Sequence, residues 1–337
     1  MSTAVSPAEV RPLLWPQGEG RGSADKRFFA LLLAATVLPI AWLTLAGLPP
    51  LAGAVPAWAT ALLIWLGGSG HVAGSFAFYF EPQARAFMIR ERPGRFVWAP
   101  LGVIAVVALA FATVHEAAVT AALVLVYWTW QVHHYSRQNM GVLAFLARAE
   151  RRPVTPAELR ALQLTDLAGI TASLPFLREF GVSMAAPWGA WLHGAGAVFF
   201  IAAICVWLAE RIRSGGQSRA RDLGMVVLLL FYLPLFLFDS FPLAVTGFAT
   251  AHGVQYFLFL GCVARVPRDR QIRALAALAG CTLVLGAVLF LSGLSARGAF
   301  YGAGLGVVMA HFVIDAGMWR LREPFQRAYM AERFSFL

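Results

Sequence analysis

Seven histidines occur in this apolar chain, and at least five of them fall inside long hydrophobic segments. An ionisable side chain in the hydrocarbon of a bilayer costs at least a few kcal/mol, so such residues usually face a bundle interior and mark a functional site. Imidazole is also the commonest metal ligand in proteins. These segments predict a metal site built from His71, His133, His134, His252, His311 and Asp315.

Residue spacing along the predicted helices supports a shared site. His311 and Asp315 are four residues apart and share one helix face, so both could bind one metal, or Asp315 could orient a ligand. Polar and aromatic neighbours on the histidine-bearing helices are predicted to hold the ligands or to line a substrate pocket. They are Tyr127, Trp130, Gln131, Gln138, Gln255 and Tyr256.

The composition places these residues in a membrane protein. Of the 337 residues, 59% are hydrophobic and only 13% are charged, and the mean hydropathy is +0.69. The net charge of +10 comes from short arginine-rich runs between apolar segments, which is typical of membrane topology rather than of a nucleic-acid-binding surface. Cys205, Cys262 and Cys281 lie in apolar stretches without paired spacing, so we expect neither disulfides nor an iron–sulfur cluster.

A membrane-spanning helix needs about 20 apolar residues, and the chain has ten such segments. They are 28–48, 57–80, 97–115, 117–136, 162–180, 187–209, 223–241, 243–264, 272–293 and 299–319. The predicted fold is therefore all-α, a polytopic helical bundle in the membrane. Residues 1–27 would form a cytoplasmic N-terminal segment without a cleaved signal peptide, 28–320 one transmembrane domain, and 321–337 a cytoplasmic tail.

The distribution of basic residues predicts the orientation of this bundle. With the N-terminus in the cytoplasm, every Lys and Arg except Arg178 and Arg297 falls on the cytoplasmic side, as the positive-inside rule requires. Both termini would then be cytoplasmic, in a bacterial-type inner membrane. This topology puts the five site histidines in the inner half of the bilayer, and puts His115 and His193 near its outer surface.

Small residues beside the histidines indicate close helix packing. Gly67, Gly68 and Gly70 precede His71, and span ten carries Gly298, Gly302 and Gly306 at four-residue intervals. Small residues at such spacing let helix backbones approach each other closely. Near the middle of the chain, Thr155, Pro156 and Glu158 have the pattern of a capped helix start.

The types of ligand restrict the chemistry. No glutamate lies well inside a span, so the four-helix di-iron pattern with Glu-x-x-His is absent. No cysteine accompanies a histidine, which argues against blue copper and structural zinc. Imidazoles with one carboxylate suit a non-haem metal ion, iron before copper or zinc. The HxxxH and HxxHH boxes of fatty-acid hydroxylases and desaturases are also missing.

These observations favour a membrane-embedded, metal-dependent oxidoreductase of the oxygenase or hydroxylase class. Its substrate would be an apolar, lipid-like small molecule, and a redox donor is a further candidate partner. Two alternatives remain open. One is a transporter that uses intramembrane His and Asp as a proton or metal-ion relay. The other is an electron-transfer protein with bis-His haem.

Four segments carry a resemblance to a known family. HVAGSFAFYF, WQVHHYSRQNMGV, AHGVQYFLFL and AHFVIDAGMWRLREP resemble the histidine-bearing helices of polytopic bacterial membrane metalloenzymes of the Brp/Blh-type carotene dioxygenase kind. The resemblance implies intramembrane histidine ligands and iron-dependent cleavage of an apolar polyene. It assigns ligand roles to His71, to His133 or His134, to His252 and to His311.

Overall fold

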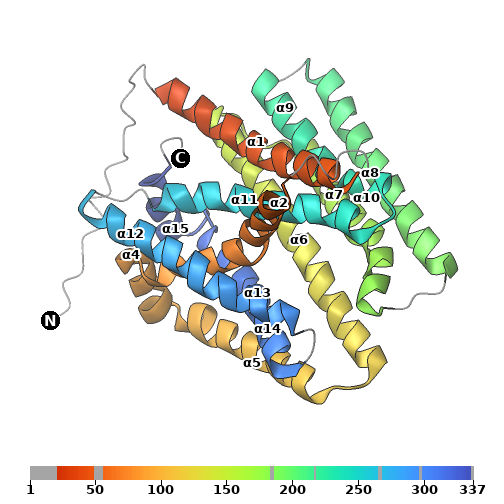
Figure 1. Ribbon diagram of the computed structural model, residues 1–337. Helices are drawn as coiled ribbons and strands as arrows, with labels where there is room; N and C mark the ends of the chain where they lie inside the picture. The colour runs from red at the N-terminus through yellow and green to blue at the C-terminus, as the bar shows by residue number, and fades with distance from the viewer. Residues whose placement is uncertain are drawn as a thin grey trace.

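Every regular element in the described part of the chain is a helix. The computed structural model describes residues 21–48, 56–182, 186–215, 218–264, 268–295 and 298–334. The α-helices are α1 (Arg21–Gly47), α2 (Ala57–Trp65), α3 (His71–Ser75), α4 (Pro82–Ala86), α5 (Ala99–Thr113), α6 (Ala117–Ala149), α7 (Pro156–Ser173), α8 (Ala186–Arg213), α9 (Arg219–Leu229), α10 (Pro234–Leu237), α11 (Phe241–Val263), α12 (Arg268–Gly280), α13 (Gly286–Leu294), α14 (Gly298–Met318) and α15 (Pro324–Ala331). Figure 1 shows them packed as one bundle.

Short π-helical and 3-10 turns join several of these helices into longer rods. The π-helical turns are η3 (Leu66–Gly70), η5 (Phe87–Glu91), η6 (Gly94–Trp98) and η9 (Cys281–Leu285), and the 3-10 turns are η4 (Phe76–Tyr79), η7 (Leu174–Phe180) and η8 (Leu230–Tyr232). The turn η3 leads directly into His71. π-Helical turns are rare and often occur at functional sites.

Within the described ranges, seven helical rods are long and apolar enough to cross a membrane. They are Arg27–Gly47, Ala57–Tyr79, Gly94–Thr113, Pro187–Arg213, Phe241–Val263, Gln271–Leu294 and Gly298–Met318. This confirms the expected all-α, multi-pass bundle, but not the count of ten. The remaining predicted spans fall on α6, on α7 with η7, and on α9 with η8 and α10, none of which has the required length and apolarity together among the described residues.

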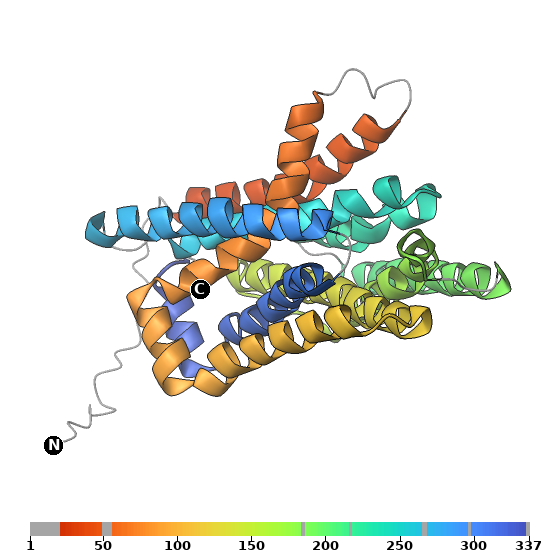
Figure 2. The same cartoon turned by 60° about the horizontal axis from the view of Figure 1, so that its bottom comes forward.

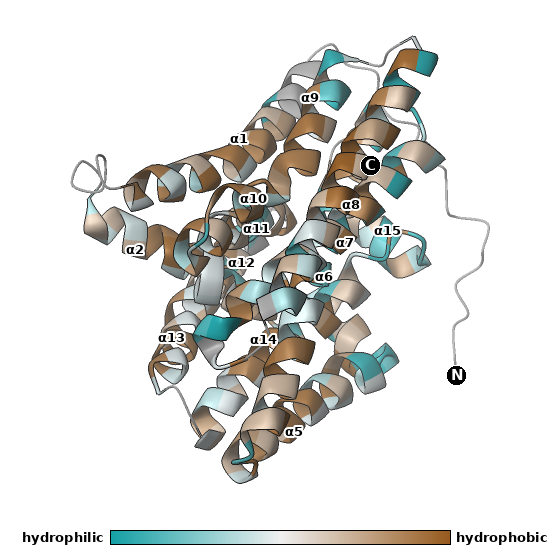
Figure 3. Cartoon of the chain, turned by 90° about the vertical axis from the view of Figure 1, so that its right-hand side faces the viewer, coloured by the Kyte–Doolittle hydropathy of each residue, from teal (hydrophilic) through white to brown (hydrophobic). Residues whose placement is uncertain are grey.

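The helices lie in two groups, and an inclined rod runs from one toward the other. In Figure 2, α1, α11 and the rod α12–α13 lie above α5, α6 and α14, and the segment that begins with α2 starts above the upper group and runs steeply down toward the lower one. Figure 3 shows apolar residues along the lengths of α5, α8 and α13, with polar residues gathered nearer the helix ends. The central rod thus carries His71 into the interior of the bundle.

Glycines allow the closest helix contacts. A methyl group on Gly306 of α14 would lie 2.7 Å from the Cα of Ile104 of α5, and one on Gly302 would lie 2.7 Å from the carbonyl oxygen of Val107. A methyl group on Gly253 of α11 would lie only 2.1 Å from the carbonyl oxygen of Gly67. The backbones of α11 and η3 therefore touch, which sets His71 beside α11.

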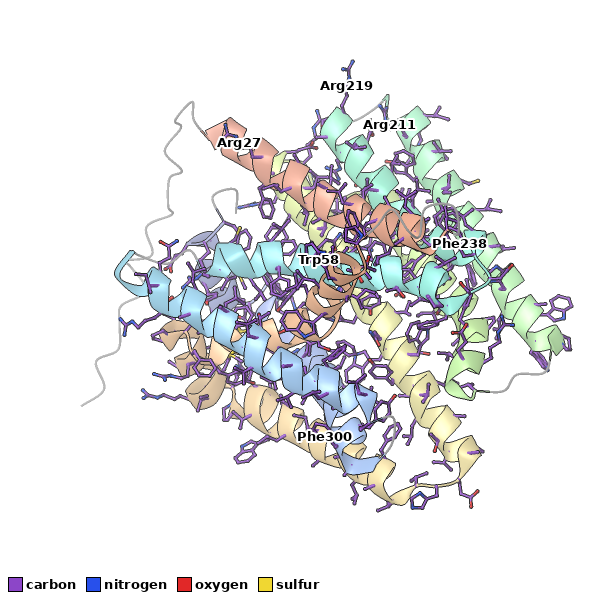
Figure 4. The ribbon with its side chains drawn as sticks, in the orientation of Figure 1. Arg27, Trp58, Arg211, Arg219, Phe238 and Phe300 are labelled. Carbon is purple, nitrogen blue, oxygen red and sulfur yellow. The ribbon has the colours of Figure 1, made fainter. Side chains whose placement is uncertain are left out.

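A capping box and a buried ion pair hold together the helix ends that are rich in arginine. Thr155 and Glu158 form the predicted capping box at the start of α7. Arg221 of α9 reaches the same Glu158, and both side chains are buried. In Figure 4, Arg27, Arg211 and Arg219 lie along the upper edge of the bundle, and Phe300 lies far from them.

Candidate metal centre

Four imidazoles from four separate rods meet at the centre of the bundle. His71 begins α3, His134 lies on α6, His252 on α11 and His311 on α14. Neighbouring ring centroids are separated by 5.0 Å (His71–His252), 4.9 Å (His252–His134), 5.0 Å (His134–His311) and 5.2 Å (His311–His71). The four rings therefore form a closed cycle, and all four residues are buried.

These spacings are compatible with imidazoles that share one metal ion. A metal–nitrogen bond of about 2.0–2.1 Å puts each ring centre about 3.2 Å from the metal, and neighbouring ring centres about 4.5–5.2 Å apart for square-planar to tetrahedral angles. The four observed spacings fall within that range. Ligand atoms of His71, His252 and His311 all lie within 4.8 Å of one another, as do those of His134, His311 and Asp315.

Several imidazole nitrogens in this cycle have no hydrogen-bond partner among the described residues. They are both ring nitrogens of His252, Nδ1 of His71, and the Nε2 atoms of His134 and His311. A buried polar atom left without a partner costs about 1–3 kcal/mol. Several unpaired nitrogens in one place would together destabilise the fold unless a ligand binds them. A metal ion would do so, because it accepts the lone pairs of these nitrogens.

Ser75 contacts the Nδ1 atom of His311. The Ser75 hydroxyl donates to the carbonyl oxygen of Val72 at 2.9 Å, and its oxygen lies 2.6 Å from Nδ1 of His311. With the Ser75 proton donated to Val72, Nδ1 of His311 carries its own proton and donates to Ser75 Oγ. The Nε2 atom of His311 then keeps its lone pair for a metal.

Asp315 lies beside this cycle and is held by Tyr256. The Tyr256 hydroxyl donates to Oδ1 of Asp315 at 2.5 Å. Oδ2 of Asp315 is 3.8 Å from Nε2 of His134, and Oδ1 is 3.5 Å from Nδ1 of His311. Trp319 in turn donates to the Tyr256 oxygen. The carboxylate is placed either to bind a metal directly or to orient the two histidines.

His133 does not join the other four histidines, contrary to its prediction as a ligand. Its Nδ1 lies 2.7 Å from Oδ2 of Asp166 on α7, and its side chain is 49% exposed. Successive residues on a helix point about 100° apart. Since His134 faces the cycle, His133 points to a different side of α6, toward Asp166 of α7. His115 and His193 also lie outside the cycle, as expected.

The predicted supporting residues occupy two different places. Gln138 donates to the carbonyl oxygen of His252 at 2.9 Å and to Gln255 at 2.8 Å, and Gln255 donates to Thr36 of α1. This chain of hydrogen bonds ties α6, α11 and α1 together behind the histidines. The Trp130 ring packs against that of Phe312, which stacks on His134 at 4.4 Å.

The other two predicted residues, Tyr127 and Gln131, line a cavity of about 360 Å³. His71 is the member of the cycle that also lines this cavity. Most of the remaining wall is apolar, including Ile64, Val72 and Leu305. Ligand sites are typically concave, largely apolar and about 300–1,000 Å³ in volume. A small apolar molecule in this cavity would therefore lie directly against the histidine cycle.

Some residues near the centre were not predicted. Ser75, Tyr135 and Phe312 all touch the histidines, with the Tyr135 ring 4.5 Å from that of His252. Ser75 had a usable signal, because it follows His71 by four residues and so shares its helix face. For Phe312 the sequence offers no such signal, since aromatic residues are frequent throughout the chain.

Comparisons with known proteins provide no further constraint: no family model, curated protein or solved structure matches the chain significantly.

Proposed function

We propose that His71, His134, His252 and His311, with Asp315, bind one metal ion, and that the protein is a membrane-embedded oxidoreductase. The donor set of imidazoles with one carboxylate favours non-haem iron, with copper or zinc as alternatives. The reaction class is that of an oxygenase or hydroxylase acting on an apolar, lipid-like substrate. The observation that carries this proposal is the cavity of about 360 Å³ that adjoins His71.

The residues of the chain have separable roles in this proposal. When bound, a redox-active ion such as iron supplies reactivity toward O2. Ser75 holds Nδ1 of His311 so that Nε2 faces the centre, and Tyr256 fixes the Asp315 carboxylate. Phe312 covers His134 and helps to exclude water. The walls of the cavity hold the substrate beside His71.

The resemblance to Brp/Blh-type carotene dioxygenases agrees with this chemistry and suggests a polyene as the first substrate to test. Of the two adjacent histidines left open by that resemblance, His134 takes the ligand role in our proposal, because only it faces the other three. We also propose that the chain crosses a bacterial-type inner membrane ten times, with both termini in the cytoplasm. The positive-inside distribution of arginine supports it.

The spacing of the rings argues for a single ion over the bis-His haem alternative. A porphyrin needs a wide, flat slot between its two axial imidazoles. Here each neighbouring pair of rings is in edge-to-face contact, with interplanar angles of 73–84°. The other two imidazoles and Asp315 occupy the space that a macrocycle would need.

Metal analysis of a matched pair of variants tests the proposal. The wild-type protein and the His133→Ala variant should each purify with about one equivalent of metal, and the His134→Ala variant should lose it, because only His134 belongs to the cycle. In nanodiscs that contain a carotenoid, the wild type and His133→Ala should consume oxygen, and His134→Ala should not. A protein that neither retains nor rebinds iron or copper would overturn the proposal, and pH-dependent ion transport by such a protein would favour the relay instead.

A further inference from the structure

The walls of the cavity beside His71 are not uniformly apolar. Tyr127, Gln131 and Tyr135 follow one another at four-residue intervals on α6, so they form one polar stripe along a single face of that helix. Thr246 and Thr250, also four residues apart, face the same cavity from α11. A pocket built only for a hydrocarbon has no need of five hydrogen-bonding side chains.

Within this stripe, Gln131 is incompletely paired. Its amide nitrogen donates to the hydroxyl of Tyr135, and its Oε1 atom has no hydrogen-bond partner among the described residues. If the amide were turned over, the nitrogen would lack an acceptor instead, so one of its two polar atoms lacks a protein partner in either orientation. Gln131 lines the cavity, and the terminal torsion of glutamine is broad, so rotation about it can turn the amide toward a ligand there.

We infer that the ligand of this cavity is amphipathic: an apolar chain that carries one hydroxyl group, with the hydroxyl held by Gln131 and the chain lying against the apolar wall. A hydroxyl both donates and accepts, so it satisfies the amide of Gln131 in either orientation. Tyr127, one turn away on the same face, offers a second hydrogen-bonding group. Most of the remaining lining is apolar and includes Val72, Leu305 and Val308, which can meet the chain of the ligand, while Ser69, His71 and Tyr301 add polar groups to it.

This inference rests on the proposed function in taking the cavity as the substrate site, and it narrows the substrate class from any lipid-like molecule to a long-chain alcohol. It also locates the polar group. Gln131 precedes His134 by three residues, so the hydroxyl is held about one helical turn from the histidine cycle. The hydroxyl is a recognition element there, while carbons of the chain lie beside His71.

Two matched probes test the inference without any catalytic step. Tritiated 1-dodecanol and tritiated dodecane differ only in the hydroxyl, and their retention by the full chain in nanodiscs can be measured against empty nanodiscs. We expect the wild-type protein to retain the alcohol about tenfold more tightly than the alkane, the worth of a good hydrogen bond in a buried site. Gln131→Leu should reduce that ratio to below about threefold, and Gln131→Met should do the same if the leucine variant folds poorly.

Leu305→Met is the control, because it changes the apolar wall at nearly constant volume and should leave the preference intact. Equal retention of the two probes by the wild type, or an unchanged preference in both Gln131 variants, would overturn the inference. An equal loss of preference in Leu305→Met would overturn it as well. Repeating the binding after chelation separates the two proposals, because a preference for the alcohol that persists in metal-free protein supports this inference whether or not the metal centre proves correct.

Discussion

Ser75 and His311, 236 residues apart in sequence, are joined through Oγ and Nδ1 at 2.6 Å. The contact links α3 to α14 and leaves Nε2 of His311 free of any hydrogen bond among the described residues. One serine thus occupies the Nδ1 side of a candidate ligand, and Nε2 is the nitrogen left for a metal ion.

Replacing Ser75 with alanine should weaken metal binding without abolishing it. Loss of a hydrogen bond that orients a ligand typically costs 10–100-fold in metal affinity, so a decrease of about that size is expected in competition with a chelator. Ser136→Ala is the matched control, because Ser136 is also buried but pairs with Tyr232, away from the histidine cycle. An affinity within about twofold of wild type in Ser75→Ala would show that Ser75 does not orient His311.

Removing the metal should lower thermal stability. A ligand that binds only the folded state stabilises it by about 2.7 kcal/mol at a hundredfold excess over its Kd, so chelation should lower the Tm measured in detergent. In the His252→Ala variant, which lacks one of the four imidazoles, the chelator should have no further effect. A shift of the same size in both proteins would mean that the chelator acts elsewhere.

Gly253→Ala should be destabilising, because the added methyl group meets the backbone of Gly67. Overpacking of this kind costs about 1–3 kcal/mol, and here it also pushes His71 away from His252, so both the Tm and the metal affinity should fall. Gly261→Ala lies on the same helix with open space around the added group and serves as the control. Since alanine favours helix by about 1 kcal/mol over glycine, Gly261→Ala should be neutral or stabilising.

Arg221→Met should destabilise the arginine-rich end of the bundle. Arg221 Nε lies 2.7 Å from Oε1 of Glu158, and its Nη2 donates to the carbonyl oxygen of Pro153 at 2.8 Å. Breaking a buried ion pair from one side costs about 3–5 kcal/mol, because the buried Glu158 carboxylate loses the charge that neutralises it in this pair. Arg219→Met, at an exposed position two residues earlier, should have little effect. If the two variants unfold at the same temperature, the ion pair is not what holds α9 to α7.

Much of the architecture could be read from the sequence because apolar length and charge distribution are local properties. Seven of the predicted spans coincide with long apolar helices, and the capping box at Thr155 is present as expected. The segments on α6, α7 and α9 were harder to assess. Their polar residues and interruptions lower the apolarity by which spans are recognised, and on α6 those polar residues include His134 and Gln138.

The sequence by itself determined that several imidazoles and one carboxylate lie in largely apolar helices, since residue type and the composition of the surrounding segment are local properties. Only the tertiary structure decided which of them meet. The choice of His134 over His133 depends on the rotation of α6, which its contacts with α11 and α14 set. The pairing of Ser75 with His311 and the cavity beside His71 depend on how far apart packed helices stand, a distance set by contacts between residues remote in sequence.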